Sequence, residues 1–137
     1  MLGKDKKVDL IAQVPLFADC SRRELRELAE TIDEVVVPAD YHLTREGTAG
    51  REFVIIIDGA ADVIRRGRKV NHLGAGDFLG EIALISGQPR TATVKTTQPT
   101  HALVLTAPAF RSLLRRRPSM QWKVLEALAA RLPPEIS

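Results

Sequence analysis

Two oppositely charged residues, Glu81 and Arg90, lie nine positions apart in a stretch, residues 78–93, that is otherwise apolar or uncharged. Gly80 lets the backbone approach a ligand closely, and residues 81–85 can form about one helical turn whose first N–H groups meet an anion. The Arg90 guanidinium can hold a phosphate with two parallel hydrogen bonds, whereas an ionised Glu81 only accepts hydrogen bonds and suits a sugar hydroxyl. The stretch therefore predicts a binding site for a phosphorylated sugar.

Three short motifs in this stretch form a specific pattern, namely Gly80-Glu81, Ala83-Leu84 and Pro89-Arg90-Thr91-Ala92. The pattern resembles the phosphate-binding cassette of the cyclic nucleotide-binding domain family, which includes the catabolite activator protein and the regulatory subunits of cyclic-nucleotide-dependent kinases. Spaced glycines extend the resemblance over much of the chain, from about residue 10 to about residue 132; they are Gly47, Gly59, Gly74 and Gly76.

The resemblance implies a role for each residue of the cassette. Glu81 would bind the ribose 2′-hydroxyl and Arg90 the cyclic phosphate. The backbone N–H groups of Ala83 and Ala92, with the hydroxyl of Thr91, would complete the phosphate cradle.

Apolar residues near the cassette are expected to enclose the sugar and the base. They are Val70, Leu73, Leu79 and Ile82. Arg131, on the last predicted helix, is expected to reach toward Glu81 or the phosphate. In the catabolite activator group the last helix continues and supplies hydroxyl residues to the adenine, whereas here residues 133–134 are prolines that end it, so base selectivity stays open.

Two of these assignments have alternatives. Glu81 and Arg90 can instead form a structural ion pair that links the ends of the loop, but a buried ion pair adds little net stability, which favours a ligand site. The Thr91 hydroxyl can serve the phosphate or the local backbone. By the same resemblance, a threonine here is linked to tolerance of cyclic GMP, because its hydroxyl can meet the guanine amino group.

Composition predicts one soluble globular domain over residues 1–137, since the chain is 45% hydrophobic and 27% charged. The net charge of +3 is mild, and its densest cluster, residues 115–117, lies at a predicted helix end where cations complement the carbonyl dipole. One cysteine, Cys20, excludes an intrachain disulfide and favours a reducing compartment. With no apolar leader or spanning segment in the sequence, we expect a cytoplasmic protein without a membrane anchor.

The residues around the cassette predict an α+β fold, with helices over about residues 6–32 followed by an antiparallel β-roll or jelly roll over about residues 33–105. Ser21 and Glu24 have the spacing of a capping box, which predicts a helix over residues 22–31. Short β-type segments separated by glycine-containing turns then predict the roll. The candidate strands begin at Val35 and continue as residues 41–43, 52–57, 60–65, 69–73, 92–96 and 101–105.

Helical periodicity returns over about residues 107–132 and predicts two helices separated by Pro118, the second lying across the roll as a lid. This second helix carries an apolar stripe headed by Trp122, which we expect to be in the core. The stripe consists of Trp122, Leu125, Ala129 and Leu132.

Metal binding and catalysis are not predicted. The three histidines, His42, His72 and His101, lie on different candidate strands without the clustering that a metal centre needs. Cys20 has no sequence partner for a catalytic pair, and the cassette has no neighbouring nucleophile or general base.

Together these patterns predict a cytosolic, non-catalytic cyclic nucleotide sensor that signals by moving its C-terminal helices, with cyclic AMP (cAMP) preferred to cyclic GMP (cGMP) as ligand. The expected protein partner is an effector, or a second copy held through the C-terminal helix, and no DNA-binding domain is expected in this chain. The alternative is an interaction or dimerisation module that keeps the β-roll but no longer uses a nucleotide. Its seam would be Leu125, Leu128 and Leu132.

Overall fold

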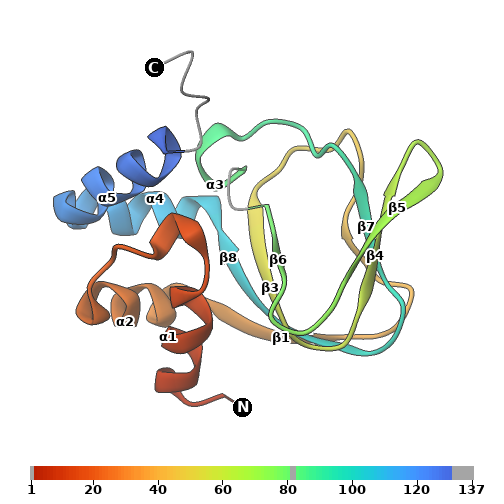
Figure 1. Ribbon diagram of the computed structural model, residues 1–137, viewed down its shortest axis with the longest axis horizontal. Helices are drawn as coiled ribbons and strands as arrows, with labels where there is room; N and C mark the ends of the chain where they lie inside the picture. The colour runs from red at the N-terminus through yellow and green to blue at the C-terminus, as the bar shows by residue number, and fades with distance from the viewer. Residues whose placement is uncertain (1, 81–82, 131–137) are drawn as a thin grey trace.

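Two four-stranded antiparallel sheets face each other, and the helices gather beside one of them, in the computed structural model of the chain (Figure 1). The structure describes residues 2–80 and 83–130. The arrangement confirms the predicted α+β fold, in which the sequence of the β-roll is flanked by N-terminal and C-terminal helices.

Each sheet mixes strands from distant parts of the sequence. The first has the order β1 (Asp33–Val37), β8 (Thr100–Thr106), β3 (Glu52–Asp58) and β6 (Phe78–Leu79). The second has the order β2 (His42–Thr44), β7 (Thr93–Thr96), β4 (Ala61–Arg65) and β5 (Arg68–Leu73).

Strand β3 is covered on both faces, as its continuous apolar run predicts. Successive side chains of a strand point to opposite faces. Phe53 and Ile55 accordingly join the core beneath the helices, while Ile56 joins a smaller cluster with Ala61 and Val94 between the two sheets. The strand therefore separates a helical core from the interior of the roll, where a ligand can be held.

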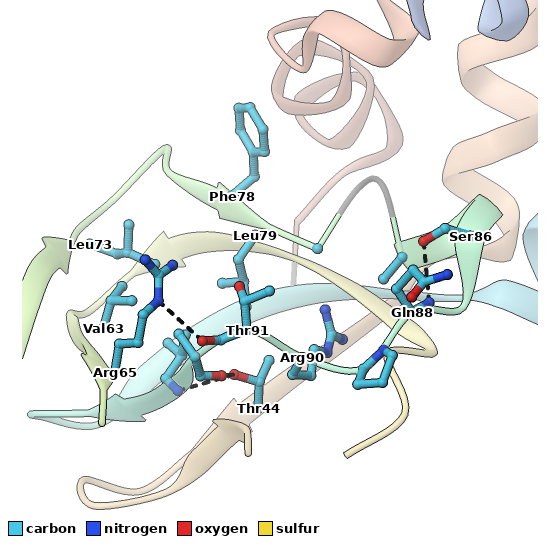
Figure 2. Close-up of a pocket in the computed structure, with 15 residues that line it drawn as sticks. Thr44, Val63, Arg65, Leu73, Phe78, Leu79, Ser86, Gln88, Arg90 and Thr91 are labelled. Atoms are coloured by element: carbon cyan, nitrogen blue, oxygen red, sulfur yellow. Dashed lines mark hydrogen bonds between the residues drawn. The ribbon is translucent and has the colours of Figure 1, made fainter. Parts of the chain in front are cut away.

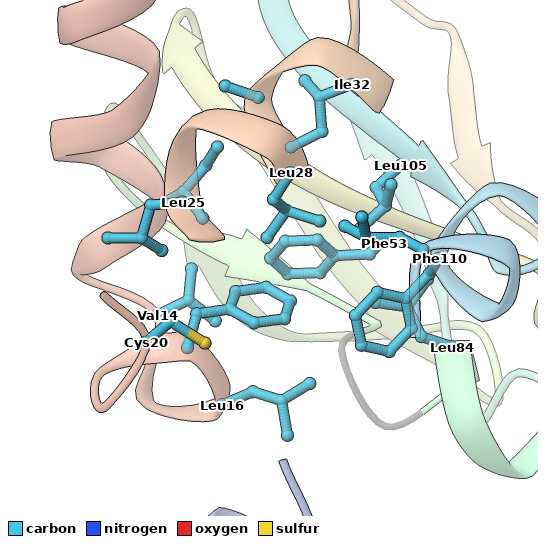
Figure 3. Close-up of a cluster of buried hydrophobic side chains, with 14 of the residues drawn as sticks. Val14, Leu16, Cys20, Leu25, Leu28, Ile32, Phe53, Leu84, Leu105 and Phe110 are labelled. Atoms are coloured by element: carbon cyan, nitrogen blue, oxygen red, sulfur yellow. The ribbon is translucent and has the colours of Figure 1, made fainter. Parts of the chain in front are cut away.

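The N-terminal helices are α1 (Lys4–Ala12), the short 3-10 helix η1 (Pro15–Phe17) and α2 (Arg22–Thr31). Helix α2 begins at the predicted capping box: the Ser21 hydroxyl accepts from the Glu24 N–H at 3.1 Å, and the Glu24 carboxylate accepts from the Ser21 N–H at 2.7 Å. Aromatic rings connect this region to the sheet and to α4 (Figure 3). The ring of Phe17 lies edge-on to Phe53 and Phe110, with centroids 6.0 and 5.7 Å away.

The C-terminal helices are α4 (Ala107–Arg116) and α5 (Pro118–Ala129), and in α5 the expected position of Trp122 is wrong. Trp122 is 64% exposed, and Leu125 is also exposed. Met120 and Val124 form the buried face instead, because α5 packs on η1 with that side. The spacing of the apolar residues could not show which face of α5 is buried, since both faces of this helix carry apolar residues at helical intervals.

Candidate functional site

A cavity of about 470 Å³ opens between the second sheet, β6 and the segment that joins β6 to β7 (Figure 2). Its walls are mostly apolar side chains from several strands, including Val63, Leu73, Phe78, Leu79 and Val94. Its polar groups come chiefly from residues 86–91 of the joining segment, with Thr44 and Arg65 from the second sheet. An apolar cleft with a few convergent polar groups is the usual form of a small-molecule site.

Backbone hydrogen bonds fix the place of Arg90 at this cavity. Its N–H donates to the Thr48 carbonyl at 2.7 Å, and its own carbonyl accepts from the Gly47 N–H at 2.8 Å. Nearby, the Gly50 N–H donates to the Gln88 carbonyl at 3.2 Å. The loop after β2 therefore clamps the segment that carries the guanidinium.

The Arg90 side chain is half-buried, and its Nη2 group donates to the Glu52 carbonyl. Burial lowers the pKa of Arg90, and the nearby Glu52 carboxylate partly opposes this. An arginine starts from so high a pKa that it still carries its charge at neutral pH. Arg90 thus provides a fixed cation with a planar fork of donors at the edge of the cavity.

Gly80 is required where it stands because it packs against this guanidinium. Its φ of +83° lies in the left-handed region that favours glycine. A Cβ at this position would run into Arg90 Nη1 and would lie 2.7 Å from the Glu52 carbonyl oxygen. The absence of a side chain lets the backbone and the guanidinium share one small space.

The structure brings several other predicted residues to the same cavity, namely Leu73, Leu79, Ala83, Thr91 and Ala92. Helix α3 (Ala83–Ser86) provides the predicted helical turn, but the Ala83 N–H here donates to the Gly80 carbonyl at 3.1 Å. The Ala92 carbonyl accepts from the Thr44 hydroxyl at 3.0 Å.

Some predicted residues are not placed at the cavity. Val70 is 54% exposed and is not among the residues that line it. Glu81, Ile82 and Arg131 lie outside the described residues.

Four lining residues outside the stretch 78–93 were not predicted, namely Thr44, Val63, Arg65 and Val94. The Thr44 hydroxyl links β2 to β7 by accepting from the Val94 N–H at 3.0 Å. Arg65 Nε donates to the Thr91 carbonyl at 3.2 Å. Alternation along residues 61–65 puts Val63 and Arg65 on one strand face, but the sequence does not say that this face meets the cassette.

Other kinds of site find little support in the described part of the chain. No group of three or more His, Cys, Asp or Glu side chains there is arranged to hold a metal ion. Burial, with the nearby Glu24 carboxylate, raises the pKa of the Cys20 thiol to about 11, so the thiolate form that reacts is suppressed. Residues 2–80 and 83–130 also contain no helix with the length and apolar character to cross a lipid bilayer.

The fold and the cavity define a β-roll domain whose cavity is bordered by the segment between β6 and β7. Sequence comparison matches residues 34–117 to the cyclic nucleotide-binding domain, and the chain belongs to this family.

Two solved structures and one sequence relative illustrate the similarity. The N-terminal domain of a transcriptional regulator from Streptomyces coelicolor A3(2) superposes with a TM-score of 0.83 at 26% identity, covering 90% of this chain and 91% of that one. The regulatory domain of Toxoplasma gondii PKA, solved with cAMP, gives a TM-score of 0.73 at 27% identity, covering 80% and 44%. A cyclic nucleotide-gated potassium channel of Rhizobium etli is 37% identical over 111 residues, which are 81% of this chain but 31% of the channel.

Proposed function

We propose that the chain is a non-catalytic receptor for a cyclic nucleotide, with cAMP as its main ligand and cGMP as the second. The observation that carries the proposal is the Arg90 guanidinium, fixed at the edge of an apolar cavity of about 470 Å³. A cavity of this volume lies in the range of small-ligand sites. The phosphate would replace the Glu52 carbonyl as the partner of Arg90, and the base would extend toward Val63 and Leu73.

The rest of the cassette would recognise the phosphate and the ribose. The Thr91 hydroxyl and the Ala92 N–H would face the phosphate, and the Ala83 N–H would join them by leaving the Gly80 carbonyl. The role of Glu81 at the ribose 2′-hydroxyl rests on the family pattern. A comparison of cAMP with 2′-deoxy-cAMP tests it, because Glu81→Ala should remove the discrimination between the two.

The roles proposed for Ile82 and Arg131 rest on the sequence: Ile82 would enclose the ribose, and Arg131 would reach the ligand from the C-terminal side.

Helix α3 offers a route from the cassette to the C-terminal helices. Leu84 is fully buried in the helical core together with Phe110 and Leu113 of α4. Arg111 Nη2 also donates to the Ile85 carbonyl at 3.4 Å. A ligand that moves α3 would therefore shift α4 and α5, provided that it binds the two arrangements with different affinity.

The output of the sensor would be an effector protein in the cytoplasm. A second candidate function, a dimerisation module, is supported by the exposed Trp122 and Leu125 on α5. In the predicted seam, Leu125 is exposed, Leu128 packs partly against the core and Leu132 lies outside the described residues. Sedimentation analysis with and without cAMP distinguishes the two candidate functions by the oligomeric state. A constitutive dimer forms without ligand, whereas a sensor needs ligand for its response.

Thermal unfolding with cAMP, cGMP and 5′-AMP tests the proposal. Ligand at about a thousand times its dissociation constant adds roughly 4 kcal/mol to stability, which raises the melting temperature by several degrees. We expect a rise with cAMP, a smaller one with cGMP and none with 5′-AMP, which lacks the cyclic phosphate. If neither cyclic nucleotide raises the melting temperature, the proposed function is wrong.

A further inference from the structure

We propose that Arg65 recognises the base of the bound nucleotide and gives the cavity an affinity for guanine beside that for adenine. The proposal rests on the proposed function, because it assumes a cyclic nucleotide whose phosphate lies at Arg90. It assigns to the β4–β5 hairpin a part in ligand selection.

Arg65 lies at the part of the cavity where the base would be. It is the last residue of β4, and it lines the cavity together with Val63 and Leu73. Figure 2 shows its guanidinium beside Leu73, on the other side of Thr91 from Arg90. A nucleotide with its phosphate at Arg90 would therefore direct its base toward Arg65.

One hydrogen bond orients the side chain and leaves other donors for a ligand. Arg65 Nε donates to the Thr91 carbonyl at 3.2 Å. Within the part of the chain that the structure describes, this is the one hydrogen bond of the Arg65 side chain, and the side chain forms no ion pair there. Arginine carries five N–H donors, so both Nη groups can donate to a ligand.

Sheet stability does not account for an arginine at this position. Arg65 lies directly opposite Arg68 in the β4–β5 register, and both are exposed. Like charges directly opposite one another on a sheet are destabilising. The contact between Arg65 and the cassette therefore suggests a use outside the sheet, and Arg68, which does not line the cavity, has no such contact among the described residues.

A guanidinium fork distinguishes the two purines by their acceptors. Guanine presents two adjacent acceptors, O6 and N7, which match two N–H donors, whereas adenine presents N7 beside the N6 amino donor. Arg65 can thus hold guanine through two bonds and adenine through one. The cavity would bind cAMP through features common to both nucleotides and would need Arg65 chiefly for cGMP.

Isothermal titration of cAMP and cGMP into the full chain and three variants tests this inference. Arg65→Met removes the charge and the donors, Arg65→Lys keeps the charge without the fork, and Arg68→Met is the matched control on the same hairpin. We expect both Arg65 variants to bind cGMP about tenfold more weakly, because a bidentate contact to the correct base contributes about 1–3 kcal/mol of discrimination. Their affinity for cAMP should change less than about threefold, because a single hydrogen bond to adenine contributes little net free energy.

Two outcomes would overturn the inference in different ways. If Arg65→Met weakens cAMP and cGMP equally, or if Arg65→Lys keeps the cGMP affinity, the side chain acts as a general positive charge and the base assignment is wrong. If the unmodified chain binds neither nucleotide, the proposed function fails as well. A melting temperature for each variant shows whether the fold is kept.

Discussion

Arg90 is held in place by its backbone, so its side chain can be removed without dismantling the loop. The bonds from its N–H to Thr48 and from the Gly47 N–H to its carbonyl do not involve the guanidinium. The guanidinium itself is bound to the Glu52 carbonyl and packs against Gly80. A substitution of Arg90 should therefore lower the affinity for an anion without a matching loss of stability of the fold.

Arg90→Ala should abolish most cAMP binding and leave the fold nearly intact. Hydrogen bonds to a charged group contribute about 1.5–3 kcal/mol each, so we expect the affinity to fall at least tenfold. Titration calorimetry measures the loss, and a melting curve without ligand checks the fold. Arg68→Ala, on an exposed arginine away from the cavity, is the control. Unchanged affinity in Arg90→Ala would contradict the assignment of the phosphate site.

Local sequence could predict the cassette, but it could not predict the residues that face the cassette across the cavity. Arg90, Thr91 and Gly80 lie in one short stretch whose residue types already suit a phosphate. Val63 and Arg65 reach the cavity only because β4 pairs with β7, which places Val63 opposite Val94. That pairing is a property of the whole roll, so no spacing within residues 61–65 reveals it.

At the scale of elements, Glu24 joins the start of α2 to the start of α5. Beyond its capping box, its carboxylate accepts from the Ser119 hydroxyl at 2.6 Å and from Lys123 Nζ at 2.5 Å. Beside it, Arg117 Nη2 donates to Glu27 at 2.6 Å. The capping box was evident from the sequence, whereas the contact with α5, 95 residues away at Ser119, depends on tertiary packing.

The protein should lose stability in acid through Glu24. Burial alone would raise the pKa of this carboxyl, but hydrogen bonds from Lys123, Ser119 and Ser21 outweigh it and lower the pKa from 4.5 to about 2. A folded-state pKa below the unfolded value stabilises the native state above about pH 4.5, and this stabilisation is lost as the pH falls toward 2.

Glu24→Gln should remove the part of the acid dependence that comes from this carboxyl. It should also lower stability at neutral pH by about 1.5–3 kcal/mol, the usual contribution of a hydrogen bond to a charged group. Urea unfolding at several values between pH 2 and pH 7 measures both effects. Glu30→Gln, on an exposed residue of the same helix, is the control. A Glu24→Gln variant whose stability falls with acid as steeply as that of the unmodified chain would rule out this role.

The two apolar faces of α5 should respond differently to substitution. Trp122 is exposed and Val124 is 4% exposed, so Val124→Ala should cost about 1–3 kcal/mol while Trp122→Ser stays within about 0.5 kcal/mol. Denaturant unfolding of both variants measures the difference. A larger loss in Trp122→Ser would mean that the helix packs through the stripe predicted from the sequence, not through the face that the structure buries.

At the scale of the whole molecule, one core joins the N-terminal helices, the first sheet, the cassette and the C-terminal helices. Phe17, Phe53 and Phe110 come from three separate parts of the chain, and Leu84 brings α3 into the same cluster (Figure 3). Packed cores resist continuous deformation. A displacement of the cassette should therefore also displace α4 and α5 and should not stay confined to the cassette.

Hydrogen exchange can show whether the ligand acts through this core. With cAMP at saturation, we expect altered amide protection in α4 and α5 as well as in residues 78–93, because Leu84 and Arg111 connect α3 to α4. Leu84→Val should reduce the packing of α3 against α4 and lower stability by about 1 kcal/mol. In this variant we expect cAMP still to protect the cassette but to change protection in the C-terminal helices less. Arg111→Met tests the second connection without opening a cavity in the core.

If cAMP changes protection in residues 78–93 alone in the unmodified chain, the ligand site is not coupled to the helices. The signal would then have to leave through the β4–β5 hairpin or the exposed surface of the roll.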